Sequence, residues 1–543
     1  MRAADFRGRE RTWGTFGCRR QVLMVARTLT STIRLLEAAR LFRDDFRVHV
    51  VFTVHGTSEF SRGARDLLRA AGEHDVVDWE DVRRRRIDYA LAVSASENID
   101  FRPLRARTVV LPHGIGFNKY VPARNGTRLA GLPPRHALRR GKVRLVLAHP
   151  DQERQLRAAC PEVAGRTAVT GDPTFDELAA SAPLRGFFRR RLGIERSGGG
   201  ADRKLVLITS TWREQSQLGR WAELPRQLLA QLPADEYQVA AVLHPNIWSW
   251  YGSRQVRSWL DPALEAGLLL PPPERGWQAL LVASDLVLGD HGSVTLYAAA
   301  LGKPLLLNAP AEETVPGTPV AELNARARRL DRWSGLREQV DGALSGGAEL
   351  DSFADGVFSN VGGSRRALRD LLYAELDLEP PEVEPPVRRQ LEPEPDQQFP
   401  TSCDVLTEWL SPTTVGITRF PRIRGETPPG GTRHLAVEES EPDLRLPQNA
   451  AVLTRRAPAA PAEALEWARE ALTRHPGARL AASATVDGSR ALLRDGTLVD
   501  VTSGGDPELL ASAVYACSLS GLTNGEFSLR AGNYRDGFTI TLR

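Results

Sequence analysis

The chain has 543 residues, of which 42% are hydrophobic and 25% are charged, and its formal net charge is +4. This length is too great for one hydrophobic core and predicts roughly two to four domains. The composition is typical of a soluble globular protein, and no run approaches the roughly 18 apolar residues of a membrane span. The four cysteines are far apart and share no CxxC spacing, which argues against a zinc ribbon and a disulfide framework.

The first 20 residues form a basic leader. They carry six Arg against Asp5 and Glu10, which equals the whole net positive charge. No apolar segment follows these charges, so the leader is not a secretory signal, and we expect a cytoplasmic protein. We interpret residues 1–20 as a disordered tail; peripheral contact with anionic lipid at the inner face of the membrane is the alternative. No RNA-binding signature accompanies the basic residues, and we expect no nucleic-acid partner.

Between residues 21 and 185, short apolar runs alternate with helical stretches. The run 21–27 is typical of a buried strand, and 31–45 has the apolar spacing of an amphipathic helix. Continuous apolar strands separated by helices predict a parallel sheet with both faces covered. We therefore expect an N-terminal Rossmann-like domain. Its further strand-like runs are 47–54, 87–96, 108–114, 144–150 and 166–173.

A second alternating series covers residues 200–375, after a glycine-containing break. Two α/β units of this size predict two doubly wound domains that face one cleft, with ligands bound beyond the carboxyl ends of the strands. The strand-like runs of this series are 204–212, 237–245, 285–290 and 303–309, and its helix-like runs are 221–233, 276–284 and 293–302.

The remainder of the chain differs in composition. Residues 376–400 are rich in proline and acidic residues, which predicts a stiff, extended linker. We interpret residues 401–543 as a small accessory α+β domain without a catalytic motif. Its strand-like runs are 413–420, 479–486 and 538–543, and its helix-like runs are 461–476 and 506–519.

Predicted strands of the first domain end in polar residues. His113 directly follows an apolar strand, and Gly114 allows close approach of a ligand. An imidazole here can accept a proton from an acceptor hydroxyl near neutral pH, although a turn histidine is the simpler interpretation of this residue alone. Asp172 and Asp176 follow another strand, where a turn and a helix cap are the alternative to a ligand site.

The second domain repeats this arrangement. Thr211 and Arg213 follow the strand at 204–212, and hydroxyl and guanidinium groups suit phosphate oxygens. An ion pair of Arg213 with a neighbouring carboxylate is the structural alternative. His244 ends the next strand and is a weak signal by itself.

The segment 284–307 carries the sharpest local signal. A buried strand ends there in a polar turn, and we predict Ser293 as the N-cap of the helix that follows. Backbone amides of the first helical turn would then point outward with the positive end of the helix dipole, which makes an anion site. A plain capped helix fits this stretch equally well. The residues that would form the anion site are Asp290, Gly292, Ser293, Val294 and Thr295.

Several enzyme classes are disfavoured by missing motifs. Ser293 does not lie in G-x-S-x-G, which argues against a serine hydrolase. The chain has no HExxH helix, no P-loop and no G-x-G-x-x-G opening the first helix. We therefore expect no metal site and no cofactor, and a nucleotide-linked donor would be a substrate.

Taken in order, these strand ends resemble the motifs of the CDP-glycerol glycerophosphotransferase family, which includes the teichoic-acid polymerases. The likeness covers residues 21–340 and implies a GT-B type architecture of two Rossmann-like domains. The similar elements are HGIGFNK (113–119, family HGT-x-x-K), GDPTFD (171–176, family G-x-P-R-x-D), STWR (210–213, family P-T-W-R), HPNI (244–247) and the segment 284–304 with its K-P pair.

The resemblance implies roles for the matching residues. His113 would deprotonate the acceptor hydroxyl, and Arg213 and His244 would contact the donor's phosphates. Ser293 and the neighbouring amides would hold the diphosphate. The further cleft candidates are Gly114, Lys119, Asp172, Asp176 and His291.

Two departures from the family pattern leave the donor open. Thr174 stands where the family has Arg, and His291-Gly292-Ser293 replaces Tyr-Ser-Ser. The altered turn is nearer to that of UDP-sugar 2-epimerases, whose D-S-G-G turn binds UDP at the same place in the same fold.

We expect a transferase that moves a glycerophosphate, alditol-phosphate or glycosyl group from a nucleotide-diphosphate donor to a hydroxyl of a cell-envelope glycan or lipid-linked acceptor. The enzyme alternative is a UDP-N-acetylhexosamine 2-epimerase-like protein, which would need acidic residues facing the sugar. The other alternative is a non-catalytic GT-B-derived binding or scaffold protein. The oligomeric state is left open.

Overall fold

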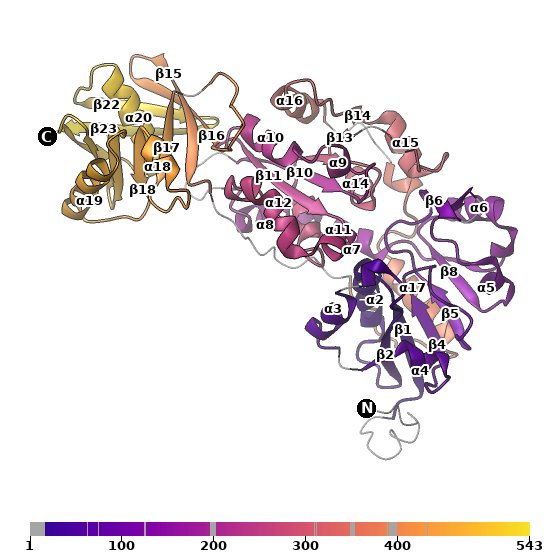
Figure 1. The fold of residues 1–543 in the computed structure, drawn as a ribbon. Coiled ribbons are helices and arrows are strands. Elements are labelled where there is room, and N and C mark those ends of the chain that lie inside the picture. The colour runs from indigo at the N-terminus through magenta and orange to yellow at the C-terminus, as the bar shows by residue number, and fades with distance from the viewer. Residues whose placement is uncertain are drawn as a thin grey trace.

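Three bodies follow one another in the chain: two α/β domains and a C-terminal barrel (Figure 1). The computed structural model describes residues 17–61, 63–73, 75–123, 126–195, 202–308, 310, 312–347, 353–387, 389, 399–431 and 433–543. Most of the predicted basic leader (residues 1–16) and much of the predicted linker (388 and 390–398) lie outside the described residues. None of the helices described is long and apolar enough to cross a membrane.

The first body contains a seven-stranded sheet of order β3-β2-β1-β4-β5-β8-β9, with parallel pairing throughout. Its central strands are buried along their length because helices cover both faces. The strands are β1 (Arg20–Ala26), β2 (Val48–Val54), β3 (Val76–Val77), β4 (Leu91–Ser94), β5 (Arg107–Val110), β8 (Val143–Leu147) and β9 (Thr167–Val169). The other elements are α2 (Leu29–Ala39), α3 (Ala64–Ala70), α4 (Trp79–Arg83), α5 (Arg135–Arg139), α6 (Pro150–Ala159) and the hairpin β6 (Tyr120–Ala123) and β7 (Gly126–Leu129).

The second body contains a parallel five-stranded sheet of order β11-β10-β12-β13-β14. Two Rossmann-like domains are therefore present, as predicted for a GT-B type architecture. The strands are β10 (Lys204–Ser210), β11 (Tyr237–Leu243), β12 (Leu286–Gly289), β13 (Leu305–Leu307) and β14 (Arg328–Arg329). The helices are α9 (Gln217–Arg220), α10 (Leu224–Gln231), α11 (Pro245–Tyr251), α12 (Ser253–Glu265), α13 (Trp277–Ala283), α14 (Ser293–Ala300), α15 (Pro319–Arg326) and α16 (Leu336–Gly346).

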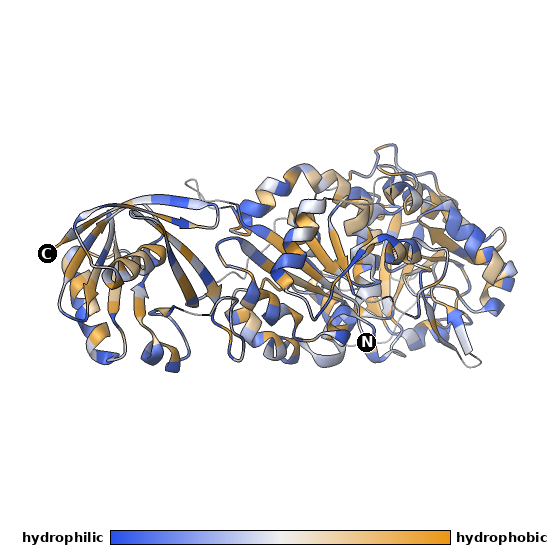
Figure 2. Ribbon diagram, turned by 90° about the horizontal axis from the view of Figure 1, so that it is seen from above, coloured by the Kyte–Doolittle hydropathy of each residue, from blue (hydrophilic) through white to orange (hydrophobic). Residues whose placement is uncertain are grey.

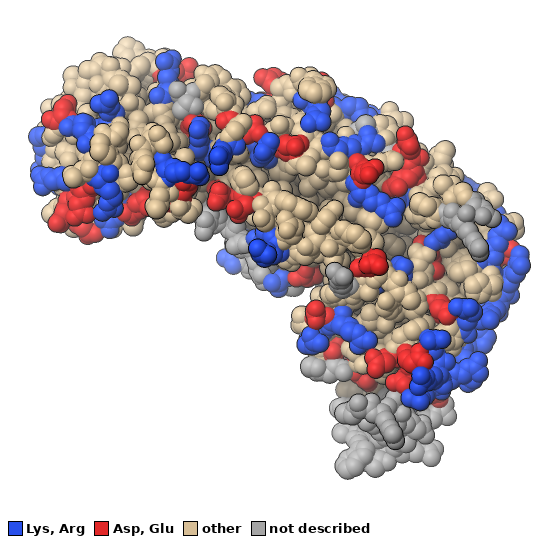
Figure 3. All heavy atoms as spheres, in the orientation of Figure 1, with Lys and Arg blue, Asp and Glu red and all other residues tan. Residues whose placement is uncertain are grey.

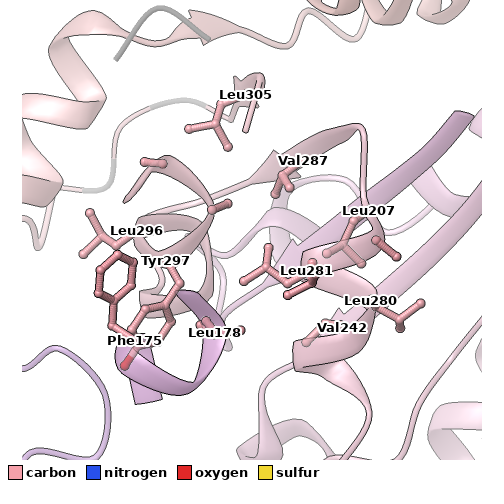
Figure 4. Packing of buried hydrophobic residues seen from close by; sticks show 14 of the residues in the cluster. Phe175, Leu178, Leu207, Val242, Leu280, Leu281, Val287, Leu296, Tyr297 and Leu305 are labelled. Carbon is pink, nitrogen blue, oxygen red and sulfur yellow. The ribbon is translucent and has the colours of Figure 1, made fainter. Parts of the chain in front are cut away.

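The chain crosses between the two α/β domains twice, and packing groups the crossing helices differently from the sequence. Helices α7 (Pro173–Ser181) and α8 (Arg185–Arg191) contribute Phe175, Leu178 and Phe188 to the core of the second domain. Figure 4 shows Phe175 beside Tyr297 and Leu296 of α14. Helix α17 (Ser364–Glu375) instead returns to the first domain, where Leu372 and other residues join the core around β1. Residues 173–185, which the sequence assigns to the first domain, thus pack against the second. Residues 364–375, which it assigns to the second domain, pack against the first.

The third body corrects the predicted α+β domain: its nine strands close into a barrel of order β15-β16-β22-β23-β21-β20-β19-β18-β17. Closure needs β16 to pair with β22 and β21 with β23, and local sequence patterns do not reveal such distant partners. The strands are β15 (Ser402–Ser411), β16 (Thr414–Pro421), β17 (His434–Glu438), β18 (Val452–Arg455), β19 (Leu480–Thr485), β20 (Gly488–Leu493), β21 (Leu498–Thr502), β22 (Gly525–Ala531) and β23 (Tyr534–Leu542).

An apolar helix lies within the curve of these strands. Helix α20 (Pro507–Leu519) is buried on nearly all sides and packs in one core cluster with residues from each of the nine strands. Helices α18 (Arg445–Asn449) and α19 (Pro461–Arg474) complete the domain, and α19 covers β19 and β20 from outside. The hydropathy colouring agrees, since the strands of all three bodies are mostly apolar and the outer helices are mixed (Figure 2).

A buried ion network joins the barrel to the second domain. The guanidinium of Arg419, on β16, is 1% exposed and lies 2.6 Å from Asp235 of the second domain. The same guanidinium contacts Asp506 at 3.0 Å and Glu508 at 3.1 Å, both at the start of α20. The amide of Ala234 also donates to the carbonyl of Arg419 at 2.8 Å. A cation with three carboxylates around it holds the barrel against the second domain.

Replacing Arg419 is expected to destabilise this junction. The variant Arg419→Met keeps most of the stem volume but removes the guanidinium that Asp235 and Glu508 share, and breaking a buried ion pair costs about 3–5 kcal/mol. Urea unfolding followed by tryptophan fluorescence measures the loss. The control Arg445→Met removes an arginine from the exposed pair with Asp443 and should stay near wild type. Equal effects of the two substitutions would contradict a stabilising role for the network.

Candidate functional site

The polar strand ends of both sheets meet where the two α/β domains face each other. His113 follows β5 in the first domain, and Thr211, His244 and Asp290 follow β10, β11 and β12 in the second. The carboxyl ends of parallel strands share one edge of their sheet, which explains why residues far apart in sequence gather here. His113 and Lys119 both lie close enough to His244 to affect its titration.

His113 is exposed, and its ring is oriented by one hydrogen bond. Nδ1 lies 3.1 Å from the carbonyl oxygen of Ala95. A carbonyl can only accept, so Nδ1 carries the proton and Nε2 of the neutral ring carries the lone pair. Among the described residues, no hydrogen-bond partner occupies Nε2. This is the tautomer that a general base needs.

Ser293 joins the two domains. Its Oγ accepts a hydrogen bond from the amide of Ile115 at 3.2 Å. Gly114 makes this approach possible, because a Cβ at that position would lie 2.6 Å from the same oxygen. Ser293 is the first residue of α14, and Gly292 is the N-cap, so the predicted N-cap is one residue off. The Oγ of Ser293 thus contacts the first domain as an acceptor, and the amides of the first turn of α14 have no intrahelical partner.

Asp290 organises the donor side of the cleft. One carboxylate oxygen accepts from the amide of Thr211 at 2.8 Å, from its hydroxyl at 2.7 Å and from the amide of Gln217 at 2.9 Å. The other oxygen accepts from the amide of Gly292 at 3.0 Å. These bonds fix the loop after β10 and the turn before α14 relative to each other. A buried carboxylate engaged in this way positions the two loops and would itself repel an anion.

Two residues of the predicted anion site, Gly292 and Thr295, can offer a ligand only their backbone. The Oγ1 of Thr295 lies 3.0 Å from that of Thr209, inside the second domain, which leaves only the backbone amide of Thr295 for a ligand. A Cβ on Gly292 would lie 2.7 Å from the methyl group of Thr211. The turn is therefore close-packed, and glycine is needed at position 292.

His244 is a neutral hydrogen-bond donor. Its Nδ1 accepts from the amide of Asn246 at 3.0 Å and caps α11, which leaves the ring proton on Nε2. Burial lowers the pKa of His244 to about 3, and the nearby charge of Lys119 acts in the same direction. The ring is therefore uncharged at neutral pH and suits a phosphate or hydroxyl oxygen.

Two cations surround Trp212. The guanidinium of Arg213 lies 4.2 Å from the ring centroid, and the ammonium of Lys119 lies 5.8 Å from it. Arg213 has a φ of 76°, in the left-handed region that is costly for a residue with a Cβ. Backbone strain of this kind is often found at functional sites. The side chain of Arg213 is exposed at this turn.

The structure adds a carboxylate that the sequence analysis missed. Glu313 accepts from Nε2 of His291 at 2.9 Å and lies 3.6 Å from the ammonium of Lys119. Burial would raise the pKa of Glu313, but the hydrogen bond from His291 and the charge of Lys119 outweigh it and hold this pKa below its usual range. Glu313 lies in an irregular loop without a motif, and only its pairing across the domains brings it here. The amide of Tyr120 donates to the carbonyl of Glu313 at 2.7 Å.

Asp172 and Asp176 support the fold rather than line the cleft. Asp172 caps α7, pairs with Arg34 at 3.1 Å and accepts from the hydroxyl of Tyr297 at 2.6 Å. Asp176 accepts from the amides of Gly362 and Ser364, at the start of α17, at 2.7 and 2.9 Å. Burial raises the pKa of Asp176, although these bonds oppose the shift. Both carboxylates lie at the two crossings between the domains.

Thr174, which stands where the family pattern has an arginine, is contacted by an arginine from elsewhere in the chain. Arg34 of α2 donates to the hydroxyl of Thr174 and to Asp172. The guanidinium thus comes from another part of the first domain and is neutralised by Asp172 and Glu37. It serves packing between α2, α7 and α14, and no sequence motif marks it.

The described residues hold no group of three or more His, Cys, Asp or Glu side chains that could bind a metal ion. A pocket of about 360 Å³ lies on the barrel, between Trp409, Phe527 and the end of α20. Its lining offers hydroxyl groups but no acid–base pair. The candidate site is the group of polar strand ends between the α/β domains.

No family model matches the chain, and a search of curated proteins found no match. Solved structures similar in fold include the wall teichoic acid polymerase TagF, at 14% identity and a TM-score of 0.45, over 66% of this chain and 89% of that chain. Another is the UDP-GlcNAc 2-epimerase from Neisseria meningitidis bound to UDP-GlcNAc, at 12% identity and a TM-score of 0.38, over 65% and 100%. A third is a glycosyltransferase from Rickettsia africae, at 11% identity and a TM-score of 0.36, over 66% and 98%. Likeness at this level assigns no family, and the function rests on the residues of the cleft.

Replacing Gly114 is expected to disturb the contact between the domains. Gly114 has a φ of 147°, and in Gly114→Ala the new methyl group would clash with the Oγ of Ser293. We expect a loss of about 1–3 kcal/mol in the free energy of unfolding, partly restored in Gly114→Ala/Ser293→Ala. Urea unfolding of the single and double variants measures this coupling. The control Gly126→Ala has a φ of 97° with open space around the new methyl, so it reports backbone strain alone. Strict additivity of the two substitutions would rule out the contact.

The neutral, partly buried His244 predicts a pH dependence of stability. Its pKa is about 3 in the folded chain and about 6.5 when unfolded, so between these values only the unfolded chain binds the proton. The free energy of unfolding therefore falls as pH is lowered from about 6.5, by up to about 1.4 kcal/mol per pH unit. His244→Asn keeps a capping oxygen for α11 and should show a shallower fall. Urea unfolding at pH 7, 6 and 5 tests this, and parallel curves would count against it.

Proposed function

We propose that the chain is a transferase that moves a glycerophosphate or another alditol-phosphate group from a nucleotide-diphosphate donor to a hydroxyl group. The acceptor would be a cell-envelope glycan or a lipid-linked precursor, and a nucleotide sugar is the second donor class. The observation that carries the proposal is the orientation of His113. Its Nδ1 is tied to a carbonyl and its Nε2 is left as a base, on the first-domain side of a cleft whose opposite side is rich in hydrogen-bond donors.

The second domain supplies the groups that suit a diphosphate. The first turn of α14 has backbone amides without intrahelical partners at Ser293, Val294 and Thr295. Arg213 adds positive charge, His244 adds a neutral N–H donor, and Lys119 adds a second positive charge from the first domain. Phosphoryl transfer depends mostly on positioning and on charge stabilisation, and these groups can provide both. Thr211, held by Asp290, would shape the turn against the donor.

In the proposed reaction the acceptor hydroxyl gives its proton to Nε2 of His113 while its oxygen attacks the donor phosphorus. A new oxygen–phosphorus bond forms, and the bond between phosphorus and the oxygen of the nucleoside phosphate breaks. The leaving nucleoside monophosphate keeps the electron pair, and its charge is met by Arg213, Lys119 and the helix amides. His113 then releases the proton to solvent.

The epimerase alternative is less well supported. That reaction would need a carboxylate free to act on the sugar. Asp290 accepts bonds from Thr211, Gln217 and Gly292, and Glu313 is held by His291 and Lys119. A scaffold without activity would not require a histidine whose Nδ1 is hydrogen-bonded and whose Nε2 is left as a base. We further propose that no cofactor takes part and that any contact with the membrane is peripheral.

Replacing His113 tests the proposal. A thermal-shift screen of CDP-glycerol, CDP-ribitol and UDP- and GDP-sugars first identifies the donor, since a bound donor raises the melting temperature. With that donor, His113→Ala should lower kcat by about 10²- to 10⁴-fold, because the base is lost, while the donor Kd stays unchanged. Loss of donor binding together with turnover would refute the base assignment.

The matched control is His136→Ala, which removes an exposed histidine of α5 and should leave kcat at the wild-type value. If none of the nucleotides raises the melting temperature, the chain is a binding or scaffold protein instead.

A further inference from the structure

Three aromatic side chains of the second domain are unusually exposed. Trp250 is 52% exposed and Tyr251 49% exposed at the end of α11, and Trp259 is 57% exposed on α12. Large aromatic rings are commonly buried, and several exposed ones on neighbouring elements mark a binding surface. None of these three rings belongs to the hydrophobic core clusters of the domain.

Trp250 continues a row of aromatic contacts that begins in the cleft, and Tyr251 and Trp259 form a second aromatic contact beside it. The ring of Trp212 lies 6.4 Å from that of His244, between centroids, and 4.8 Å from that of Phe60. Phe60 comes from the first domain and also lies 5.7 Å from Trp250. Tyr251 follows Trp250 in the chain and lies 4.7 Å from Trp259. We call Trp212, Phe60, Trp250, Tyr251 and Trp259 the aromatic track.

Local structure keeps the outer rings together. Helix α11 ends at Tyr251, and Gly252, with a φ of 80°, turns the chain directly into α12. The tight turn brings Tyr251 and Trp259 edge to face, at an interplanar angle of 73°. The exposed neighbours on α12 are mixed: Ser253, Gln255 and Ser258 are uncharged hydrogen-bonding groups, and Arg254, Asp261 and Glu265 are charged.

Resting on the proposed function, we propose that the aromatic track binds a saccharide chain of several ring units, which is the acceptor extending out of the cleft. The apolar C–H face of a sugar ring stacks on an aromatic ring, and its hydroxyls bond to neighbouring hydroxyl and amide side chains. A row of half-exposed rings that starts beside His244, at the strand ends between the two domains, suits successive sugar units better than one compact ligand.

Charge near the end of α12 disfavours a membrane surface as the occupant. Burial together with the carboxylates of Asp261, Glu441 and Asp443 raises the pKa of Glu265 at the end of this helix. The acidic groups at this end of α12 would repel anionic lipid, whereas Arg254 and Arg257 lie nearer the start of the helix. Figure 3 shows a mostly uncharged stretch of surface over the middle of the molecule, where Figure 1 places α11 and α12.

The test measures binding to the full chain without a donor. Two series of oligosaccharides, of N-acetylglucosamine and of glucose, with two, four and six units, are titrated by calorimetry. In at least one series the six-unit chain should bind about tenfold more tightly than the two-unit chain, because it reaches the outer rings. Trp259→Ala and Tyr251→Ala should each remove most of this gain and leave two-unit binding unchanged.

The control is Trp333→Ala, which removes a tryptophan of the same domain that is 87% exposed and lies outside the track. It should leave both affinities unchanged. Affinity that does not grow with chain length in either series, or an equal loss in Trp333→Ala, overturns the proposal. So does loss of binding to phosphatidylglycerol vesicles in Trp259→Ala with no length-dependent binding of saccharide, which would make the surface a membrane contact.

The two proposals can fail separately. A chain that binds long saccharides through Trp259 but binds none of the nucleotide donors keeps the track and loses the transferase. A chain that transfers to a short acceptor without any gain from longer ones keeps the transferase and loses the track.

Discussion

The carboxylate of Asp290 is the interaction on which the cleft depends. It is buried at the end of β12 and accepts hydrogen bonds from the loop after β10 and from the turn before α14. Without these bonds, two backbone segments from different strands would have unsatisfied amides and no fixed distance between them. With them, Thr211 and the first turn of α14 form one rigid surface. The cationic side chains Arg213 and Lys119 then lie next to a surface of backbone donors.

The relative position of the two α/β domains is set by close contacts as well as by the covalent crossings. Ser293 accepts from the amide of Ile115 only because Gly114 has no Cβ, and Glu313 pairs with the backbone of the first domain at Tyr120. Asp172 and Asp176 anchor the helices at the two crossings. Charged residues that look like ligands in the sequence therefore include several that hold the domains together, because a buried carboxylate is most stable where backbone amides and arginines satisfy it.

The two histidines of the cleft differ in chemistry because their first hydrogen bonds differ. His113 donates from Nδ1 to a carbonyl and keeps a basic Nε2, whereas His244 accepts at Nδ1 from an amide and offers an N–H. Burial beside Lys119 keeps His244 neutral, while His113 is exposed. The same residue type at equivalent strand ends thus supplies one candidate base and one hydrogen-bond donor. The paired His291 and Glu313 form a third unit that anchors Lys119 near Trp212.

The sequence by itself determined the two parallel sheets and the strand ends at which polar residues gather. Buried parallel strands are continuous apolar runs, and this is a local property that one sequence displays. His113, His244 and Asp290 could therefore be assigned to the cleft from the apolar runs that precede them. Only the tertiary structure decided the tautomers and hydrogen-bond partners of these residues, since both depend on atoms from distant segments. Glu313, Arg34 and the closure of the barrel were invisible in the sequence for the same reason: each arises from pairing between parts of the chain that no local pattern connects.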